Sequence, residues 1–430
     1  MKSLRYGKVD LIKDQTYYVS LENIVQVKEN TYEIIFDGIE KSKINFLNQT
    51  TLLESYEEII PHLFSITVEE KIYFEIKDFL KKEIYKSKWF KLIVSDKETE
   101  MPVSIYIDNN TDEEPVPENK FISVIKQIHS RNSSSKKLNK FFSWKNFKFG
   151  NREEITQALN QSFIQNTPHL IHKLNVYNVG QGSLTAITDQ FNTPLLYFDL
   201  GGGYKKYHNT YSRTLNLCFK NTQTIVISHW DGDHIETARR YLTNSPSKLD
   251  NKTWIAPEQK ITISYFKLAA KMNATGNLII WPKSLRGIIR SWFDQLIKCN
   301  GSDKNHSGLA LIVDSPNNSI KKVLHPADSA YLYIPWISKI KFDGLVSTHH
   351  GANFDTNNSP LPNCSQGNIV YSHGNGYGHP TTNSITAHQN AGWRNRIDTV
   401  VGNISFTTNN SPNNVACHGA NCDLAITRTF

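Results

Sequence analysis

The stretch that decides the fold is Thr224-Ile-Val-Ile-Ser-His229-Trp-Asp231-Gly-Asp233-His234. An apolar run typical of a buried β-strand ends just before the first histidine, and four potential metal ligands then follow within six residues. The sequence of residues 235–242 predicts a helix that begins at this cluster. Imidazole and carboxylate together suit Zn²⁺ or Mn²⁺, and α/β folds place their sites where a strand ends and a helix begins. The stretch therefore predicts a divalent-metal site, with a solvated turn as the alternative for the stretch taken alone.

Further motifs flank this stretch on both sides. Two glycine-bearing segments precede it and predict two or three strands joined by turns. Downstream segments predict more strands, several of which end in histidine or aspartate. In chain order the motifs are Val179-Gly-Gln-Gly182, Asp199-Leu-Gly201, Asn305-His-Ser-Gly308, Ala327-Asp328, His349-His350-Gly351 and Tyr377-Gly-His379-Pro380.

This ordered series resembles the metallo-β-lactamase superfamily, and most of all the hydrolase domain of bacterial competence DNA-uptake channel proteins. That group shows His-x-Asp-x-Asp-His where the rest of the superfamily has His-x-His-x-Asp-His. The likeness runs over residues 175–380, nearly half of the chain. It implies an α/β metallo-β-lactamase αββα sandwich over residues 166–430. A small α+β domain over residues 1–165 is expected to precede it.

The resemblance also implies two divalent metal ions, zinc or manganese, and a set of ligands. One ion would be bound by His229 and Asp231, and the other by Asp233 and His234. Asp328 would bridge the ions or complete a site. The full set of implied metal ligands is His229, Asp231, Asp233, His234, Asp328 and His349.

Three histidines in the late motifs have implied roles beside the metals. His349 and His350 compete for the place of the late ligand, and we assign His349 to metal and His350 to substrate. His379 would stabilise the substrate oxyanion or protonate the leaving oxygen, and Asp233 and His379 form the expected catalytic set. Taken alone, His379 in a Gly-Pro loop is equally compatible with a structural role.

The chain departs from the family pattern at several positions. Residues 235–237 read Ile-Glu-Thr where the family has Ile-Gly-Gly, and Ala327 replaces the glycine of Gly-Asp. His325 is an extra candidate ligand beside Asp328. No obvious histidine matches the superfamily's third motif, although His306 lies near that place. These departures leave the geometry of the metal site open.

The first 165 residues contain no catalytic motif. Tyr32–Phe36 and Lys43–Leu47 predict two strands, with Asp37-Gly38 as the hairpin turn signal between them. Apolar residues at helical spacing predict a helix over residues 69–86. Trp89–Val94 and Val103–Ile107 predict two more strands.

Residues 119–152 combine basic and aromatic side chains without an acidic residue. Such a segment suits single-stranded nucleic acid, because cations hold phosphates while rings stack on bases. The simpler interpretation, which we favour, is a linker whose aromatic residues dock onto the domains. The net charge of +8 permits a polyanionic partner without requiring one.

The resemblance implies phosphodiester hydrolysis, with DNA as the leading substrate. A nuclease domain behind a domain that binds a partner protein or regulates the cut would suit a bacterial defence system. A second hypothesis is hydrolysis of a cyclic nucleotide, lactone or thioester, in a pocket closed by residues 254–282. A third is a binding or scaffold protein with a vestigial metal site, in which replacement of Asp233 changes nothing.

Compartment signals point to the cytoplasm. Neither a signal peptide nor an apolar run long enough to span a membrane is present in the sequence. The five cysteines are an odd number thinly spread, which indicates free thiols rather than a disulfide framework. The segment Cys417-His418-Gly-Ala-Asn-Cys422 has two potential metal ligands too few, so we expect a turn with two buried thiols.

Overall fold

The fold is known from a computed structural model, and its described residues divide into two units. The first unit comprises residues 1–146 together with Ile261–Ala270, and the second comprises Phe147–Lys260 and Lys271–Phe430. The described residues are 15–48, 59–75, 77, 89–95, 101–107, 118–127, 132–163, 173–203, 210, 215–243, 246–291, 294–314, 322–354, 358–374, 378–406 and 428–429.

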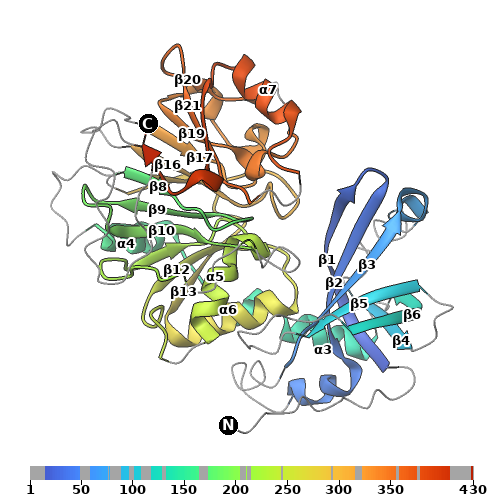
Figure 1. Cartoon of the computed structure of the whole chain (residues 1–430). Coiled ribbons are helices and arrows are strands. Elements are labelled where there is room, and N and C mark those ends of the chain that lie inside the picture. The colour runs from blue at the N-terminus through green and yellow to red at the C-terminus, as the bar shows by residue number, and fades with distance from the viewer. Residues whose placement is uncertain are drawn as a thin grey trace, which may run out of the picture. The chain divides into compact units, whose positions relative to one another are not determined.

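The first unit is a closed antiparallel barrel in the order β1-β2-β3-β5-β6-β4, drawn from blue to teal in Figure 1. Alternate residues along each strand face inward, and the barrel core includes Val19, Phe36 and Phe64. Because the barrel is closed, each strand has a hydrogen-bonded neighbour on both sides. The strands are β1 (Gln15–Lys28), β2 (Thr31–Glu40), β3 (His62–Glu69), β4 (Phe90–Ser95), β5 (Met101–Ile107) and β6 (Glu118–Gln127).

The predicted hairpin at Asp37-Gly38 is wrong. Both residues lie inside β2, and the turn to β1 instead uses Asn30, whose φ is 59°. The Asp37 carboxylate is buried and accepts a hydrogen bond from the backbone N–H of Ser264 at 2.7 Å, so a tertiary contact overrides the turn signal. Residues 43–47 fall in a 3₁₀ helix, η1 (Lys41–Asn48), rather than a strand.

Other predictions for the first unit are confirmed. β4 and β5 contain the two predicted strands almost in full. Residues 70–75 are helical as expected, while most of the remaining predicted helix lies outside the described residues. The strands β1 and β6 were not predicted from the sequence.

The basic and aromatic segment is folded rather than extended. It contains β6, the helix α3 (Ser133–Phe141) and the short strand β7 (Lys148–Phe149). Phe141, Phe142, Trp144 and Phe147 are buried, so these rings do not offer free faces for bases to stack on. The interpretation of this segment as a docked connection fits the structure better.

The domain boundary predicted at residue 165 falls inside the second unit. The helix α4 (Arg152–Gln161) begins at a capping box, in which Asn151 and Glu154 bond each other's backbone N–H groups. Ile155 and Leu159 of this helix are buried in the core of the second unit. The chain therefore enters the second unit at Phe147.

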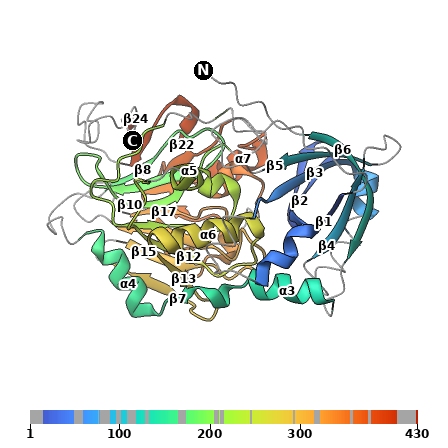
Figure 2. The same cartoon turned by 90° about the horizontal axis from the view of Figure 1, so that it is seen from below.

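The second unit is a mixed α/β structure built on two large sheets, green to red in Figures 1 and 2. The nine-stranded sheet has the order β24-β23-β8-β9-β10-β11-β12-β13-β7, and the seven-stranded sheet has the order β14-β15-β16-β17-β19-β21-β22. One core is formed by side chains of both sheets, among them Phe198, Val226, Leu311 and Val346, so the sheets pack face to face.

Helices cover the outer faces of these sheets. The helix α5 (Gly232–Thr243) contacts β10 of the first sheet. A second apolar cluster, which includes Leu324, Ile369 and Trp393, lies on the outer face of the other sheet, with α7 (Thr382–Asn390) packed against it through Ile385. The order of layers is helix, sheet, sheet, helix.

The sequence predicted the strands that carry the motifs. The first sheet contains β8 (Lys173–Val176), β9 (Leu184–Thr188), β10 (Pro194–Leu200), β11 (Thr224–Val226), β12 (Thr253–Pro257), β13 (Asn277–Trp281), β23 (Ile404–Phe406) and β24 (Arg428–Thr429) besides β7. The second contains β14 (Ile288–Arg290), β15 (Asp294–Lys298), β16 (Leu309–Asp314), β17 (Lys322–His325), β19 (Gly344–Val346), β21 (Asn368–Tyr371) and β22 (Asn395–Asp398). The helix α6 (Ile263–Thr275) lies between β12 and β13 in sequence.

The segment 254–282, considered above as the cover of a small-molecule pocket, has both of its ends in the nine-stranded sheet. Trp254 and Trp281 are fully buried within β12 and β13. Ile261–Ala270, in the middle of the segment, belong to the first unit.

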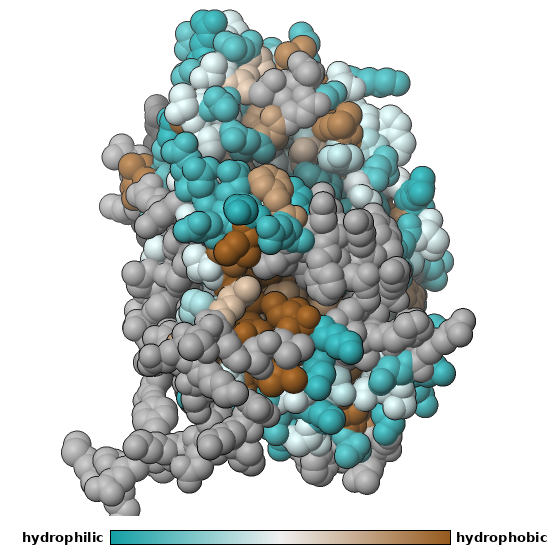
Figure 3. Space-filling model, turned by 90° about the vertical axis from the view of Figure 1, so that its right-hand side faces the viewer, coloured by the Kyte–Doolittle hydropathy of each residue, from teal (hydrophilic) through white to brown (hydrophobic). Residues whose placement is uncertain are grey.

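The surface shows both hydrophilic and hydrophobic residues. On the face drawn in Figure 3, hydrophilic residues cover much of the coloured area, with a smaller hydrophobic group among them. No described helix is both long and apolar enough to cross a bilayer. Cys218, Cys299 and Cys364 carry free thiols as expected, whereas Cys417 and Cys422 lie outside the described residues.

Candidate metal centre

The ligand loop lies at the carboxyl end of β11, a parallel neighbour of β10. The chain leaves β11 at Val226, turns through the loop, and enters α5 at Gly232. His229 and His234 are fully buried, with ring centroids 4.1 Å apart. The predicted strand, loop and helix around the ligands are confirmed.

Two substitutions in the family motif have structural explanations. Glu236 is buried and forms ion pairs with Arg239 and Arg240, which hold this carboxylate inside the first turns of α5. The Thr237 hydroxyl donates to the carbonyl of Gly201 at 2.5 Å and fixes the helix to the end of β10. Ile-Glu-Thr thus anchors the helix through side chains.

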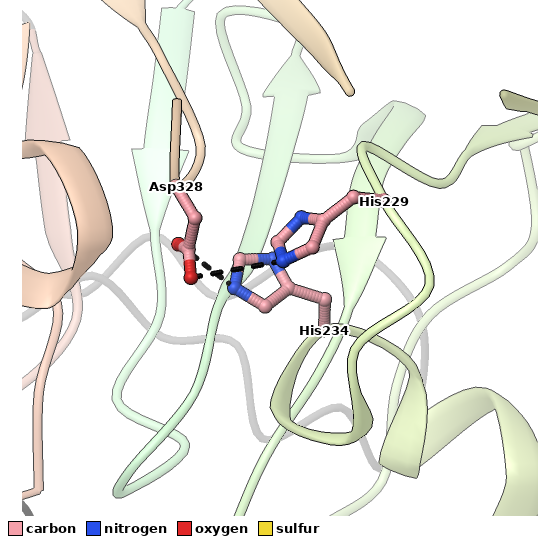
Figure 4. Close-up of side chains that lie close together, drawn as sticks. All are labelled: His229, His234 and Asp328. Atoms are coloured by element: carbon pink, nitrogen blue, oxygen red, sulfur yellow. Dashed lines mark ion pairs between the residues drawn. The ribbon is translucent and has the colours of Figure 1, made fainter. Parts of the chain in front are cut away.

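Asp328 lies at the centre of the cluster and follows the carboxyl end of β17. Its carboxylate oxygens lie 3.0 Å from Nε2 of His234 and 3.6 Å from Nε2 of His229 (Figure 4). Figure 4 shows the two rings and the carboxylate pointing toward one another from separate elements. The Asp328 carboxylate therefore faces both rings, and its predicted role as a metal ligand stays a prediction.

The two late histidines follow β19 and lie in the 3₁₀ turn η6 (Thr348–Gly351). His349 and His350 have φ values of 46° and 55°, a left-handed conformation that is uncommon outside glycine and clusters at functional sites. His350 is buried, with Nε2 3.2 Å from Oδ2 of Asp233 and 3.7 Å from Oδ1 of Asp328. The His349 side chain is 40% exposed, with Nε2 3.4 Å from Oδ2 of Asp328.

The Asp199 carboxylate orients the His234 ring, a role that the sequence did not predict. Its carboxylate accepts hydrogen bonds from Nδ1 of His234, the backbone N–H of Ser228 and the Ser228 hydroxyl, each at 2.7 Å. Because the single hydroxyl proton of Ser228 goes to Asp199, its oxygen accepts from Nδ1 of His229 at 3.0 Å. The Asp-x-Gly motif was the available signal for Asp199.

The same tautomer therefore occurs at three buried rings. His350 donates from Nδ1 to the carbonyl of Ser372 at 2.7 Å, so in each of the three rings it is Nε2 that faces the cluster. Nε2 of His229, His234 and His350 makes no hydrogen bond despite complete burial. Such an arrangement, with Nδ1 held by an acceptor and Nε2 bare, is typical of histidine ligands to metals.

Two sets of donors could hold a cation among the described residues, each with its donor atoms within 4.8 Å of one another. One comprises His229, His234 and Asp328, and the other comprises Asp233, His234 and His350. Imidazole and carboxylate donors of this kind suit a divalent transition metal. The residues thus fit a metal, and His350 rather than His349 belongs to the ligand sets.

The charges of the cluster are strongly coupled. Burial and the neighbouring His234 hold the pKa of His229 well below its ordinary value. Burial alone would lower the pKa of His234, but the carboxylates of Asp328 and Asp199 raise it well above that value. Burial would raise the pKa of Asp328, yet the imidazoles, led by His234, bring it well below the ordinary range. The cluster therefore contains deprotonated carboxylate next to protonated imidazole when it holds no cation.

Asp231 is the one predicted ligand of the loop that lies outside both sets. Its Oδ1 lies 3.1 Å from Nζ of Lys304 and accepts the backbone N–H of Gly232 at 3.0 Å. Lys304 belongs to the loop before β16, where the superfamily's third motif is expected. The sequence offered no signal for this pair, because the two residues are far apart in the chain.

Three other histidines occupy different environments. His379 lies edge to face with His349, at 5.8 Å between ring centroids. His325 accepts from the backbone N–H of Ala327 and contacts the hydroxyl of Thr185 at 2.9 Å, so both ring nitrogens are engaged and it is no ligand. His306 pairs with Asp303 outside the cluster. Tyr377 of the late motif lies outside the described residues.

No protein-family model matches the chain, and no curated protein matches it. Among solved structures, the chain is similar to human tRNase Z, short form, over 46% of this chain and 92% of that one, at 12% sequence identity and a TM-score of 0.28. A TM-score this low does not establish a shared fold, so the site has to be understood from its own geometry.

Proposed function

We propose that the second unit is a metal-dependent hydrolase of the metallo-β-lactamase type. The observation that carries this proposal is the set of three buried imidazoles whose bare Nε2 atoms face two carboxylates. The layer order and the ordered motifs support the same class. The site also lies beyond the carboxyl ends of parallel strands, where α/β folds place their ligands.

In this proposal the residues that bind divalent metal, expected as two ions of zinc or manganese, come from the two donor sets: His229, His234, His350, Asp233 and Asp328. A bound divalent ion supplies Lewis-acid activation of water and of a phosphoryl oxygen. The chain's own contribution is to fix the imidazole tautomers and to keep the two carboxylates deprotonated beside them. His350 replaces His349 as the late ligand, because its side chain is buried and oriented by a backbone carbonyl.

His379 is proposed to contact the substrate rather than the cation. Burial, together with the neighbouring His349 and His350, lowers the pKa of His379 to about 3. A neutral imidazole can donate a hydrogen bond to a developing oxyanion but is a poor store of a transferable proton. Of the two roles predicted for His379, oxyanion stabilisation is the better supported.

We propose DNA as the substrate, on the resemblance of the motifs and on charge. The net charge of +8 favours a polyanion, and Lys136, Lys140 and Lys145 are exposed. The buried rings of the same segment give no support for base stacking. The barrel of the first unit is proposed to bind a partner protein, in a cytoplasmic bacterial defence system.

The test is a cleavage assay of the full chain on single- and double-stranded DNA with Mn²⁺, Mg²⁺ or Zn²⁺. Asp233→Ala should reduce cleavage by more than about 100-fold, because even the outer partners of metal ligands are worth about 10- to 100-fold. Asp314→Ala, which removes a carboxylate paired with Lys322 on β17, is the matched control and should leave the rate unchanged. Equal activity of the wild type and the Asp233→Ala variant would refute the proposal.

Two other outcomes separate the alternatives. Metal bound without cleavage of any nucleic acid would favour a small-molecule hydrolase, to be tried on cyclic nucleotides, lactones and thioesters. Absence of metal binding would favour the scaffold hypothesis. Metal analysis of the purified protein therefore accompanies the assay.

A further inference from the structure

The two donor sets cannot each bind an ion with all of their ligands, because both sets include Nε2 of His234. His234 belongs to each set, and its Nδ1 is committed to Asp199 at 2.7 Å. Only Nε2 remains, and one imidazole nitrogen binds one ion. If His234 joins Asp233 and His350 in one site, the other set retains only His229 and Asp328.

The missing ligand on the His229 side would be Asp231, the first acidic residue of the loop motif. Its carboxylate is instead paired with the Lys304 ammonium at 3.1 Å. The two side chains are only 15% and 17% exposed, so this pair is mostly shielded from water.

The loop that carries Lys304 is fixed beside the ligand loop. Gln259 donates from Nε2 to the carbonyl of Lys304 at 2.6 Å and accepts the backbone N–H of Trp230 at 3.1 Å, so one side chain joins the two loops. A Cβ at Gly308 would come within 2.7 Å of the carbonyl of Ser228, which shows how closely the loops pack. Lys304 is thus held in place by its backbone.

We propose that Lys304 takes the place of a second metal ion, so that the cluster binds a single divalent cation on the His350 side. This inference rests on the proposed metal-dependent function. The ammonium repels a cation at His229 and neutralises the carboxylate that would have held one. It also supplies fixed positive charge at the edge of the site, which suits an anionic substrate such as a phosphodiester.

The experiment measures metal stoichiometry rather than activity. The metal-free full chain is titrated with Mn²⁺ while electron paramagnetic resonance records the free ion and any spin coupling between paired ions. The variants are Lys304→Met, which removes the ammonium, and Lys304→Arg, which keeps the charge. Lys322→Met, which breaks the pair between Lys322 of β17 and Asp314 of β16, is the matched control.

The wild type, Lys304→Arg and Lys322→Met should each bind one ion tightly. Lys304→Met should bind a second ion about 10- to 100-fold more tightly than the wild type does, since Asp231 becomes available. Asp231→Asn should leave the affinity of the first ion unchanged, which keeps the inference testable if Lys304→Met does not fold. A tenfold loss in this variant would mean that Asp231 is a ligand and would overturn the inference.

Two ions of comparable affinity in the wild type, with spin coupling, would overturn the inference and leave the hydrolase proposal intact. A folded Lys304→Met variant that still binds only one ion would also overturn it. Absence of Mn²⁺ binding in every protein would refute the metal centre itself, and with it both proposals.

Discussion

Two buried carboxylates, one in each unit, differ in almost everything except burial. Asp37 lies in β2 of the barrel, fully buried, and burial with the nearby Glu22 raises its pKa to about 7. Asp328 is nearly as buried, yet its pKa is well below the ordinary range, because the imidazoles around it outweigh the cost of burial. Burial alone neutralises an acid, whereas burial among cationic groups keeps it charged.

The comparison separates a structural acid from a ligand. Asp37 accepts the backbone N–H of Ser264, and the charged group that raises its pKa is the Glu22 carboxylate, so the Asp37 carboxylate serves the local fold. Asp328 has oxygens within 3.7 Å of Nε2 atoms from His229, His234 and His350. Several Nε2 atoms and a charged carboxylate thus share one buried space, where the proposed cation would bind.

Asp328→Asn should have the largest effect. The substitution removes the charge on which the imidazoles converge, and loss of one partner of a buried charged pair costs about 3–5 kcal/mol. We expect cation affinity to fall by more than about 100-fold and hydrolysis to fall with it. Isothermal titration with Mn²⁺ measures the loss. Unchanged affinity in a folded variant would remove Asp328 from the centre of the site.

Asp37→Asn should change stability and leave cation binding alone. Because the folded-state pKa is raised from 3.8 to about 7, the folded protein binds a proton that the unfolded chain releases. The stability of the wild type therefore falls as pH rises from about 4 to about 7, by up to about 4 kcal/mol, and stays lower above that range. Asparagine cannot titrate, so the variant should lose this dependence and be the more stable protein at about pH 8.

Calorimetric unfolding at about pH 5 and about pH 8 checks this prediction. The advantage of the variant over the wild type should be clearly larger at the higher pH than at the lower one. The same pH dependence in both would mean that Asp37 is charged in the folded state, and the contrast with Asp328 would be lost.

The sequence predicted the local parts of the site and missed the distant ones. His229, Asp233 and His234 could be assigned because a strand, a loop and a helix place them within six residues. The pair of Asp231 with Lys304 could not be foreseen, since it depends on two loops that Gln259 joins. The choice between neighbouring histidines depends on a left-handed turn that no periodicity reveals.

The barrel of the first unit shows the same limit of prediction from sequence. Its strands β4 and β5 follow from β-branched and aromatic runs, whereas the Asp37-Gly38 turn signal failed. Asp37 instead bonds Ser264, far along the chain, and Gly38 lies where a Cβ would come within 2.3 Å of the Val19 side chain. Local turn chemistry predicts structure only where no tertiary contact competes for the same residues.

Asp199→Asn tests whether the outer carboxylate fixes the ligand rather than only the fold. Asparagine can still accept from Ser228, but it removes the negative charge that holds the Nδ1 proton of His234. We expect cation affinity to fall by about 10- to 100-fold. The ¹⁵N chemical shifts of the His234 ring report its tautomer independently of activity. An unchanged tautomer and affinity would reduce Asp199 to a purely structural acid like Asp37.

The pH dependence of cation binding should be the most specific effect. The carboxylates of the cluster raise the pKa of His234 and His350 against the lowering effect of burial, so both rings hold protons above the ordinary histidine range when no cation is bound. Binding must displace these protons, and affinity should therefore rise with pH between about 6 and about 8, by up to about tenfold per pH unit for each proton released.

Titration calorimetry in two buffers of different ionisation enthalpy counts the protons. His350→Gln should release one proton fewer than the wild type, whereas Asp314→Ala should release the same number. An affinity that is equal at both ends of this range would show that the imidazoles are already neutral, and that Asp328 lacks the cationic surroundings that distinguish it from Asp37.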